Sequence, residues 1–475
     1  MVGVMAALAA FPAVAGAGSP GRWEDFSGPV GGSDEQTTLL RMADGRLHVV
    51  WGQSDRSKAD LVHRAIAPNG AVGPSSPIAS DFVGVGSAPA LVAEGTGLRV
   101  FFGGQRSTET GDPVQGILTA TSPDGGATWS SPQAITECCS PQGTGGGFVS
   151  AVRLGDGTPL VFSSGSGFGI VAHRGLDPAT PLINYSDALP GYGTMLYAAT
   201  ARDPRSGITV MAFQATAGPR NGVHAVAVDE ASGGPQGSPV AFPGLSDSFV
   251  SSSQNTRITA RPGGGLFIAH ADGERTLLWP VGAPRSVLLG GGAGNHYVAS
   301  VAPTPDGRVW VIWTLEQAGK VAVIARRSNP QVTRFGERVT IAAPANTQRI
   351  YAIDASSQAL RLDVVGTVGT FAAGNAAVSQ QHTQLLPPLE LSASPRSFRG
   401  GRTQQVVFTV TDVGVPVAGA TVTAAGRSDT SDARGRAVLR LAAPRDGGRI
   451  RVTARQPDYR DDRLTLAVRR ARRGG

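Results

Sequence analysis

Residues Thr121–Pro132 read TSPDGGATWSSP, and this stretch joins two short apolar runs, GILTA before it and QAIT after it. Asp124 can accept hydrogen bonds from backbone N–H groups of its own turn, and Gly126 can adopt a positive φ without steric cost. Trp129 begins the next apolar run and can bury its ring beneath the turn. The stretch therefore predicts a tight turn between two β-strands.

The turn residues Ser122, Asp124, Gly126, Thr128 and Trp129 have the spacing S-x-D-x-G-x-T-W. This pattern resembles the Asp-box of BNR and sialidase-like β-propellers, where it links the two outer strands of a blade. The match covers about eight residues, a length typical of a single turn, and it occurs once. The resemblance implies a β-propeller and a scaffold role for these five residues.

Tight turns followed by apolar runs recur along the first 370 residues, as at Ala43-Asp44-Gly45-Arg46 before LHVVW and Pro305-Asp306-Gly307 before RVWVIW. The runs end at Trp51, Phe102, Phe162, Phe213, His270, Trp313 and Val365, separated by 51, 60, 51, 57, 43 and 52 residues. A blade of four antiparallel strands takes about 40–50 residues. The spacing predicts an all-β, seven-bladed propeller whose last blade is completed by the segment Trp23–Val30. Six blades is the alternative, because sialidases have six and the hairpin Tyr351–Val365 is the weakest.

The 475 residues suggest more than one domain, and 65 Gly with 33 Pro indicate turns rather than long helices. The apolar start, which contains Ala13-Val14-Ala15, is typical of a signal peptide, although no Lys or Arg precedes Arg22. No later apolar run reaches 18 residues, so we expect no transmembrane span in the mature chain and a secreted or cell-surface location. We expect a signal-like segment at 1–20, the propeller at 21–378, a linker at 379–388, a second β domain at 389–468 and a basic tail at 469–475.

The segment TDVGVPVAGATVTAAGRSDTSDARGRAVLRLAA, with Gly419, Asp432 and Gly435, resembles bacterial Ig-like and carboxypeptidase-regulatory-like modules. The resemblance implies a C-terminal β-sandwich that acts as a spacer or adhesion unit. Residues 389–475 contain 17 Arg and 8 Asp plus Glu, a net charge of +9, which leaves −2 for the rest of the total of +7. We expect attraction to an anionic cell envelope. Nucleic-acid binding is not expected, because no nucleic-acid-reading motif accompanies the charge.

The two cysteines, Cys138 and Cys139, are neighbours. Adjacent Cα atoms across a trans peptide lie about 3.8 Å apart, closer than in ordinary disulfides, so a bond between them would be a strained vicinal ring. Two small unbonded thiols are the other interpretation.

In a propeller, the loops between blades and between second and third strands converge on one face near the axis, where ligands bind. The ligand-binding candidates on those loops are Arg56, Arg106, Tyr192, His270, Arg275, Asn295, His296, Tyr297, Arg349 and Tyr351. The carboxylates that could form a catalytic pair are Asp112, Asp247, Asp272 and Glu274. The seven histidines show no metal-ligand spacing, so we expect no metal and no cofactor.

Sialidases require three arginines, an Asp acid/base and a Tyr nucleophile paired with a Glu, and their Arg-Ile-Pro motif is absent from this sequence. Catalysis is therefore not carried over from the resemblance. The sequence favours an exported protein that binds glycan or extracellular protein. A glycoside hydrolase using loop carboxylates is the alternative, and a structural spacer is the second alternative.

Overall fold

The computed structural model describes residues 21–30, 37–55, 58–86, 88–106, 114–136, 147–165, 169–216, 220–245, 256–372 and 375–471. These residues are almost entirely β, with one short helix, α1 (Tyr185–Ala188), so the all-β prediction is confirmed. No helix in these ranges is long and apolar enough to cross a membrane. The signal-like segment 1–20 and the pair Cys138 and Cys139 lie outside the described residues.

Antiparallel sheets follow one another along the chain up to Leu385. The first consists of β2 (Thr38–Arg41), β3 (Leu47–Asp55), β4 (Lys58–Ile66) and β5 (Val72–Phe82). The second consists of β6 (Gly84–Val85), β7 (Ala90–Glu94), β8 (Gly97–Arg106), β9 (Val114–Ser122) and β10 (Gln133–Thr136). The third consists of β11 (Phe148–Arg153), β12 (Pro159–Gly165), β13 (Gly169–Arg174) and β14 (Ile183–Asn184). The fourth consists of β15 (Thr194–Arg202), β16 (Thr209–Thr216), β17 (Gly222–Val228) and β18 (Pro235–Ala241).

A longer sheet comes next and holds β19 (Arg257–Ala260), β20 (Leu266–Ala271), β21 (Gly273–Pro280), β22 (Val287–Pro303), β23 (Val309–Gln317), β24 (Lys320–Arg327) and β25 (Val339–Ala342). The last sheet of the ring holds β26 (Thr347–Gln358), β27 (Arg361–Ala372), β28 (Asn375–Leu385) and β1 (Glu24–Val30). Strand β22 pairs with β21 through its first half and with β23 through its second half. Because β22 runs without a break from one group of strands into the next, the number of blades stays a prediction.

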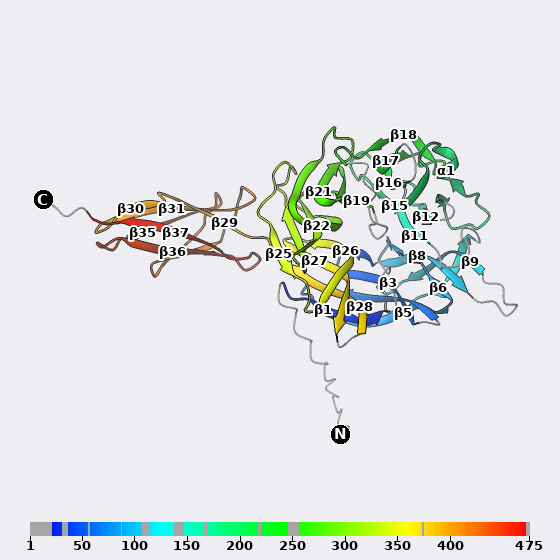
Figure 1. Cartoon of the computed structure of the whole chain (residues 1–475), viewed down its shortest axis with the longest axis horizontal. Coiled ribbons are helices and arrows are strands. Elements are labelled where there is room, and N and C mark those ends of the chain that lie inside the picture. The colour runs from blue at the N-terminus through cyan, green and yellow to red at the C-terminus, as the bar shows by residue number, and fades with distance from the viewer. Residues whose placement is uncertain are drawn as a thin grey trace, which may run out of the picture.

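The sheets close into a ring, which confirms the β-propeller (Figure 1). The innermost strands contact one another in the closed order β2, β7, β11, β15, β19, β22, β26 and back to β2. Two segments that are far apart in the sequence close the ring. Strand β1 pairs with β28, with Glu24 opposite His382 and Val30 opposite Val378. This is the closure expected for Trp23–Val30.

The expected linker at 379–388 is wrong over most of its length, because Ser379–Leu385 belong to β28 and pair with β27. The segment looks like a linker because it is polar, yet its side chains are buried. Several of their polar atoms find partners inside the ring: His382 Nε2 and Gln384 Nε2 both lie 2.8 Å from the Asp363 carboxylate. Hydrogen bonding of this kind removes most of the cost of burying polar groups.

Apolar side chains fill the spaces between neighbouring sheets rather than the ring axis. One cluster packs Val50 and Leu61 of the first sheet against Val100 and Phe102 of the second. Strands buried on both faces read as continuous apolar runs, as VWVIW at 309–313 does, and Trp310 and Trp313 are fully buried. This packing fixes the orientation of each sheet in the ring and therefore the position of the loops that connect its strands.

Residues beyond Leu389 form two sheets around a separate core that includes Phe408, Val422 and Val452. One sheet contains β29 (Glu390–Ser394), β31 (Thr403–Asp412), β32 (Val415–Pro416) and β35 (Arg436–Ala442). The other contains β30 (Ser397–Arg399), β37 (Asp462–Arg469), β36 (Gly448–Arg455), β33 (Thr421–Ala424) and β34 (Arg427–Thr430). This C-terminal sandwich extends away from the ring (Figure 1). Its membership of the Ig-like class stays a prediction.

Candidate functional site

The ring has one face directed away from the C-terminal sandwich, which we call the distal face. On this face, the second half of β22 begins at Asn295, β23 ends at Gln317 and β26 begins at Thr347. The opposite ends of these strands lie toward the sandwich, since Arg308, which immediately precedes β23, donates to the Asp412 carbonyl of β31 at 3.1 Å. The distal face therefore collects the loops on which ligand contacts were expected.

The turn Thr121–Pro132 is built as its sequence predicts. The Asp124 carboxylate accepts from the Thr128 hydroxyl at 2.6 Å, the Thr128 amide at 2.9 Å and the Ser122 hydroxyl at 2.8 Å. These hydrogen bonds, the Thr128 hydroxyl foremost, lower the pKa of Asp124 to about 2. Trp129 Nε1 donates to the Gly126 carbonyl at 3.2 Å. The Asp124 carboxylate thus makes its hydrogen bonds within the turn.

Three of the predicted residues come together on the distal face. The Arg349 guanidinium lies over the Tyr297 ring at 5.1 Å and over the Tyr351 ring at 5.7 Å. The Tyr297 hydroxyl donates to Glu316 Oε2 at 3.2 Å. All four side chains are partly exposed. We call Tyr297, Glu316, Arg349 and Tyr351 the Arg349 cluster. It joins β22, β23 and β26 and offers a cation, a carboxylate and two phenols at one place.

The backbone of β26 explains how Tyr351 reaches this cluster. The pairing of β26 with β27 shifts register between Ile350 and Ala352, so Tyr351 occupies a β-bulge. A bulge re-aims the side chain of the extra residue. Gly369 of β27 lies opposite Arg349, and a Cβ on Gly369 would stand 2.6 Å from the Tyr351 ring. Glycine at 369 is therefore what allows the ring to lie against the strand.

Asp272, Glu274 and Arg275 form a turn between β20 and β21 on the same face. The Asp272 carboxylate accepts from Arg275 Nη2 at 2.6 Å and from the Arg275 amide at 2.8 Å. Burial alone would raise the pKa of Asp272, but these hydrogen bonds outweigh it and leave the pKa below its ordinary value. Arg275 also donates to the Gly244 carbonyl at 3.3 Å. The pair fixes the turn, and Glu274 is exposed beside it.

Three other candidates are core side chains. His270 and His296 are only 4% and 2% exposed, and His296 Nδ1 lies 2.8 Å from the Thr276 hydroxyl. Burial lowers the pKa of His270 to about 4. Tyr192 packs edge-on against Phe213 within a hydrophobic cluster. These three were expected on loops, but each points into the packing between sheets and is not exposed to a ligand at the surface.

The remaining candidates divide into two groups. Asn295 is exposed and lies opposite Glu316 in the pairing of β22 with β23, so it borders the Arg349 cluster. Arg106 is the last residue of β8, and its side chain is outside the described part of the chain. The positions that lie wholly outside the described residues are Arg56, Asp112 and Asp247.

Three polar or aromatic positions on or near the distal face were not predicted from the sequence. Glu316 is the second-last residue of β23, and an acidic residue that interrupts the apolar run was the available signal. Phe371, near the end of β27, is 47% exposed. Arg257 begins β19 and lies 3.5 Å from the Asp354 carboxylate of β26, while its Nη2 donates to the Thr37 carbonyl at 3.1 Å. Arg257 thus ties inner strands together across the ring.

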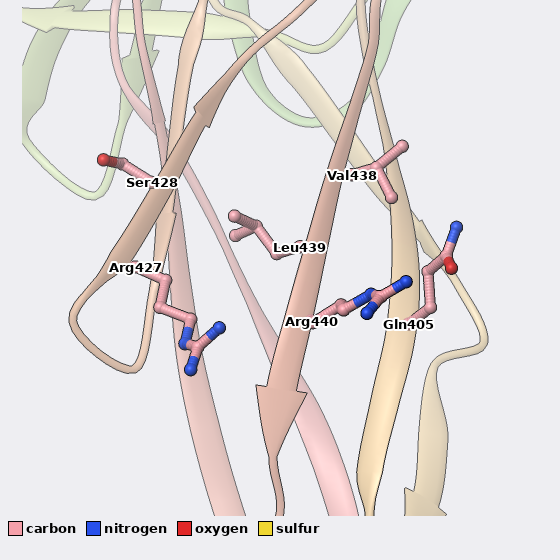
Figure 2. Close-up of a pocket in the computed structure, with 6 residues that line it drawn as sticks. All are labelled: Gln405, Arg427, Ser428, Val438, Leu439 and Arg440. Atoms are coloured by element: carbon pink, nitrogen blue, oxygen red, sulfur yellow. The ribbon is translucent and has the colours of Figure 1, made fainter.

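The C-terminal sandwich has a groove of about 590 Å³ between the edge strands β34 and β35. Figure 2 shows the residues that line it, which are Gln405, Arg427, Ser428, Val438, Leu439 and Arg440. The groove lies on the other domain and shares no residue with the Arg349 cluster. Within the described ranges, no group of three or more His, Cys, Asp or Glu side chains could hold a metal ion.

No family model and no curated protein matches this chain. Solved structures resemble it at low identity. An ulvan lyase, a polysaccharide lyase, has 10% identity and a TM-score of 0.43, covering 75% of this chain and 93% of its own. A Trypanosoma rangeli sialidase has 12% identity and a TM-score of 0.40, covering 90% and 83%. A lectin in complex with alpha methyl fucoside has 12% identity and a TM-score of 0.34, covering 63% and 96%.

Proposed function

We propose that the distal face binds glycans that carry a carboxylate group, through the Arg349 cluster. The observation that carries this proposal is the position of the Arg349 guanidinium over the rings of Tyr297 and Tyr351. A guanidinium that lies over aromatic rings keeps its charge and its N–H donors, and a guanidinium can bind a carboxylate with two hydrogen bonds. The positive charge then selects an acidic sugar over a neutral one.

The neighbouring groups suit the rest of a sugar. Tyr297, Tyr351 and Glu316 supply hydroxyl and carboxylate oxygens that can bond sugar hydroxyls. Phe371 lies two residues along β27 from Gly369, which faces Arg349, and its ring is exposed. An exposed ring beside polar groups provides a flat apolar surface for the C–H face of a sugar.

The experiment is a glycan array probed with the full chain and with matched variants. Arg349→Met and Phe371→Ser alter the proposed site, while Arg46→Met and Ile208→Ser remove an exposed arginine and an exposed apolar residue from hairpins on the opposite face. We expect carboxylated glycans to be bound, Arg349→Met to weaken binding at least about 10-fold, the size of one charge-assisted hydrogen bond, and Phe371→Ser to weaken binding as well. Equal losses in site and control variants, or selection of neutral glycans, would count against the proposal.

A second candidate function is glycoside hydrolysis, favoured by one contact. The Tyr297 hydroxyl donates to Glu316 at 3.2 Å, and a phenol beside a carboxylate base is the arrangement that activates a tyrosine nucleophile. A panel of chromogenic glycosides separates the two functions. Turnover that disappears in Tyr297→Phe while glycan binding persists would establish hydrolysis, whereas binding without turnover supports a binding protein.

A further inference from the structure

A second surface of this protein has a composition unlike the rest of the chain. The five-stranded sheet β30-β37-β36-β33-β34 of the sandwich buries one face against the core and exposes the other. Strand β36 shows the alternation, since Ile450, Val452 and Ala454 are buried while the residues between them point outward. The outward positions of the sheet carry six exposed arginines, Arg399, Arg449, Arg451, Arg455, Arg463 and Arg469. We call this surface the basic face.

The strand register places these arginines in one continuous array. Arg399 lies beside Arg469, Arg463 lies opposite Thr453, and Arg455 lies opposite Thr421. Along β36, Arg449 and Arg451 are two residues apart, a separation of about 7 Å on the same face, and neighbouring strands lie about 4.8 Å apart. The array is therefore an extended set of positive charges that runs along the sheet rather than a single patch.

The charges on the basic face are largely uncompensated. In the described part of the chain, Arg455 pairs with Asp461 at 3.0 Å, and the other five arginines form no ion pair with a carboxylate. The remaining outward positions of these strands are Ser, Thr or Ala, with no Asp or Glu among them. Like charges held this close on a folded surface repel one another, and a bound anion relieves that repulsion.

The opposite outer surface of the same sandwich is different. It carries two arginines on β35, Arg436 and Arg440, together with Val438 and with Glu390 of β29. The excess positive charge of the C-terminal segment is thus concentrated on one of its two outer faces. Since the sandwich extends away from the ring, the ring does not cover this face (Figure 1).

We propose that the basic face binds a linear polysaccharide whose sugar rings carry carboxylates. Guanidinium groups spread along a sheet can pair with charges repeated along an extended chain. The intervening threonines, such as Thr453 and Thr465, offer hydroxyls that can bond sugar hydroxyls. This site is separate from the Arg349 cluster and belongs to the other domain, so neither proposal depends on the other.

Other polyanions fit the basic face less well. Its outward positions contain no aromatic side chain on which the bases of a single strand could stack, and it has no helix or ribbon to enter a duplex groove. It also has no large exposed apolar side chain that could enter the headgroup region of a membrane. Hydroxyls and arginines together suit an acidic polysaccharide.

The test measures binding of the full chain to immobilised polygalacturonate, with a single-stranded oligonucleotide and phosphatidylglycerol vesicles as further arms. The variant is Arg449→Ser/Arg451→Ser, and the control is Arg436→Ser/Arg440→Ser, which removes the same charge from the opposite face. We expect the first to weaken polygalacturonate binding at least about 10-fold and the control to change it less than about 2-fold, with wild-type binding falling as salt rises. The loss in Arg449→Ser/Arg451→Ser should also be seen when both chains compared carry Arg349→Met, so that any binding at the Arg349 cluster does not contribute to the difference.

Equal losses in the two double variants would overturn the proposal, because net charge alone would then explain binding. Absence of polygalacturonate binding by the wild-type chain, or tighter binding to the oligonucleotide or the vesicles, would overturn it as well. All four replaced arginines are exposed, so thermal unfolding of each variant should match that of the wild type and confirm that a loss of binding is not a loss of fold.

Discussion

Arg327 of the ring and Asp412 of the C-terminal sandwich form an ion pair whose side chains are only 1% and 2% exposed. Arg308 lies 3.7 Å from the same carboxylate, and Asp306 lies 2.8 Å from Arg308 and 3.3 Å from Arg327. The Tyr459 hydroxyl donates to Asp412 at 3.4 Å. A buried ionic network therefore fixes the sandwich to the face of the ring opposite the Arg349 cluster.

The first prediction concerns this network. Asp412→Ala leaves two buried arginines with less compensation and should lower the free energy of unfolding by about 3–5 kcal/mol. Asp458→Ala is the control at the same junction, because its pair with Arg361 is 52% and 41% exposed and should contribute less than about 1 kcal/mol. Chemical denaturation measures both. Similar small effects from the two variants would mean that the network does not hold the domains together.

The second prediction concerns the contact between the Thr121–Pro132 turn and the preceding sheet. A Cβ on Gly126 would lie 2.0 Å from the ring of His63, whose Nε2 is 3.0 Å from His48 Nδ1. Gly126→Ala should therefore displace a buried histidine in addition to straining the backbone. Gly157→Ala is the control, because Gly157 also has a positive φ but nothing lies within 4 Å of its added Cβ.

Positive φ alone should cost about 1–2 kcal/mol in Gly157→Ala. Gly126→Ala should exceed that cost by a further 1–3 kcal/mol or so, from the lost histidine hydrogen bonds. Denaturant titration of both variants gives the difference. Equal destabilisation would show that the turn does not press on His63.

The third prediction concerns pH. The pKa of Asp124 in the folded protein is about 2, below its ordinary 3.8, so its hydrogen bonds stabilise the turn fully above pH 4 and are lost as pH falls toward 2. Thr128→Val removes one donor to this carboxylate. The difference in thermal midpoint between wild type and Thr128→Val should therefore be constant near neutral pH and shrink below about pH 4.

Ser130→Ala serves as the control for that measurement. The Ser130 hydroxyl accepts from the Thr121 amide at 3.0 Å, a bond between uncharged groups in the same turn. Its effect on the thermal midpoint should not depend on pH. A Thr128→Val difference that stays constant down to pH 3 would contradict the role assigned to Asp124.

Much of the fold could be predicted from the sequence, because hairpin turns and strand periodicity are local. The turns that precede LHVVW and RVWVIW lead into β3 and β23 as expected, and the segment Trp23–Val30 closes the ring. The linker was misplaced for a reason that local patterns cannot show. Ser379–Leu385 is a polar strand, and its burial depends on Asp363, Thr367 and Ser27 elsewhere in the chain.

The candidate site was predicted less well, because some of the residues expected on loops are exposed on the distal face and others are buried between sheets. Tyr297, Arg349 and Tyr351 were named and do meet. His270 and His296 lie in strands, where successive side chains point to opposite faces of the sheet. Whether a histidine in a strand is buried depends on the neighbouring sheet that packs against its face. Glu316 was missed because its partner Tyr297 comes from another strand, 19 residues away.

The most direct measurement of the central claim compares one ligand in two forms. A carboxylated glycan from the array and its methyl ester are titrated calorimetrically into the full chain and into Arg349→Met. We predict that the free acid binds the wild-type chain at least about 10-fold more tightly than the ester, and that Arg349→Met binds both equally weakly. Equal affinity of acid and ester for the wild type, or an unchanged preference for the acid in Arg349→Met, would contradict a carboxylate site at Arg349.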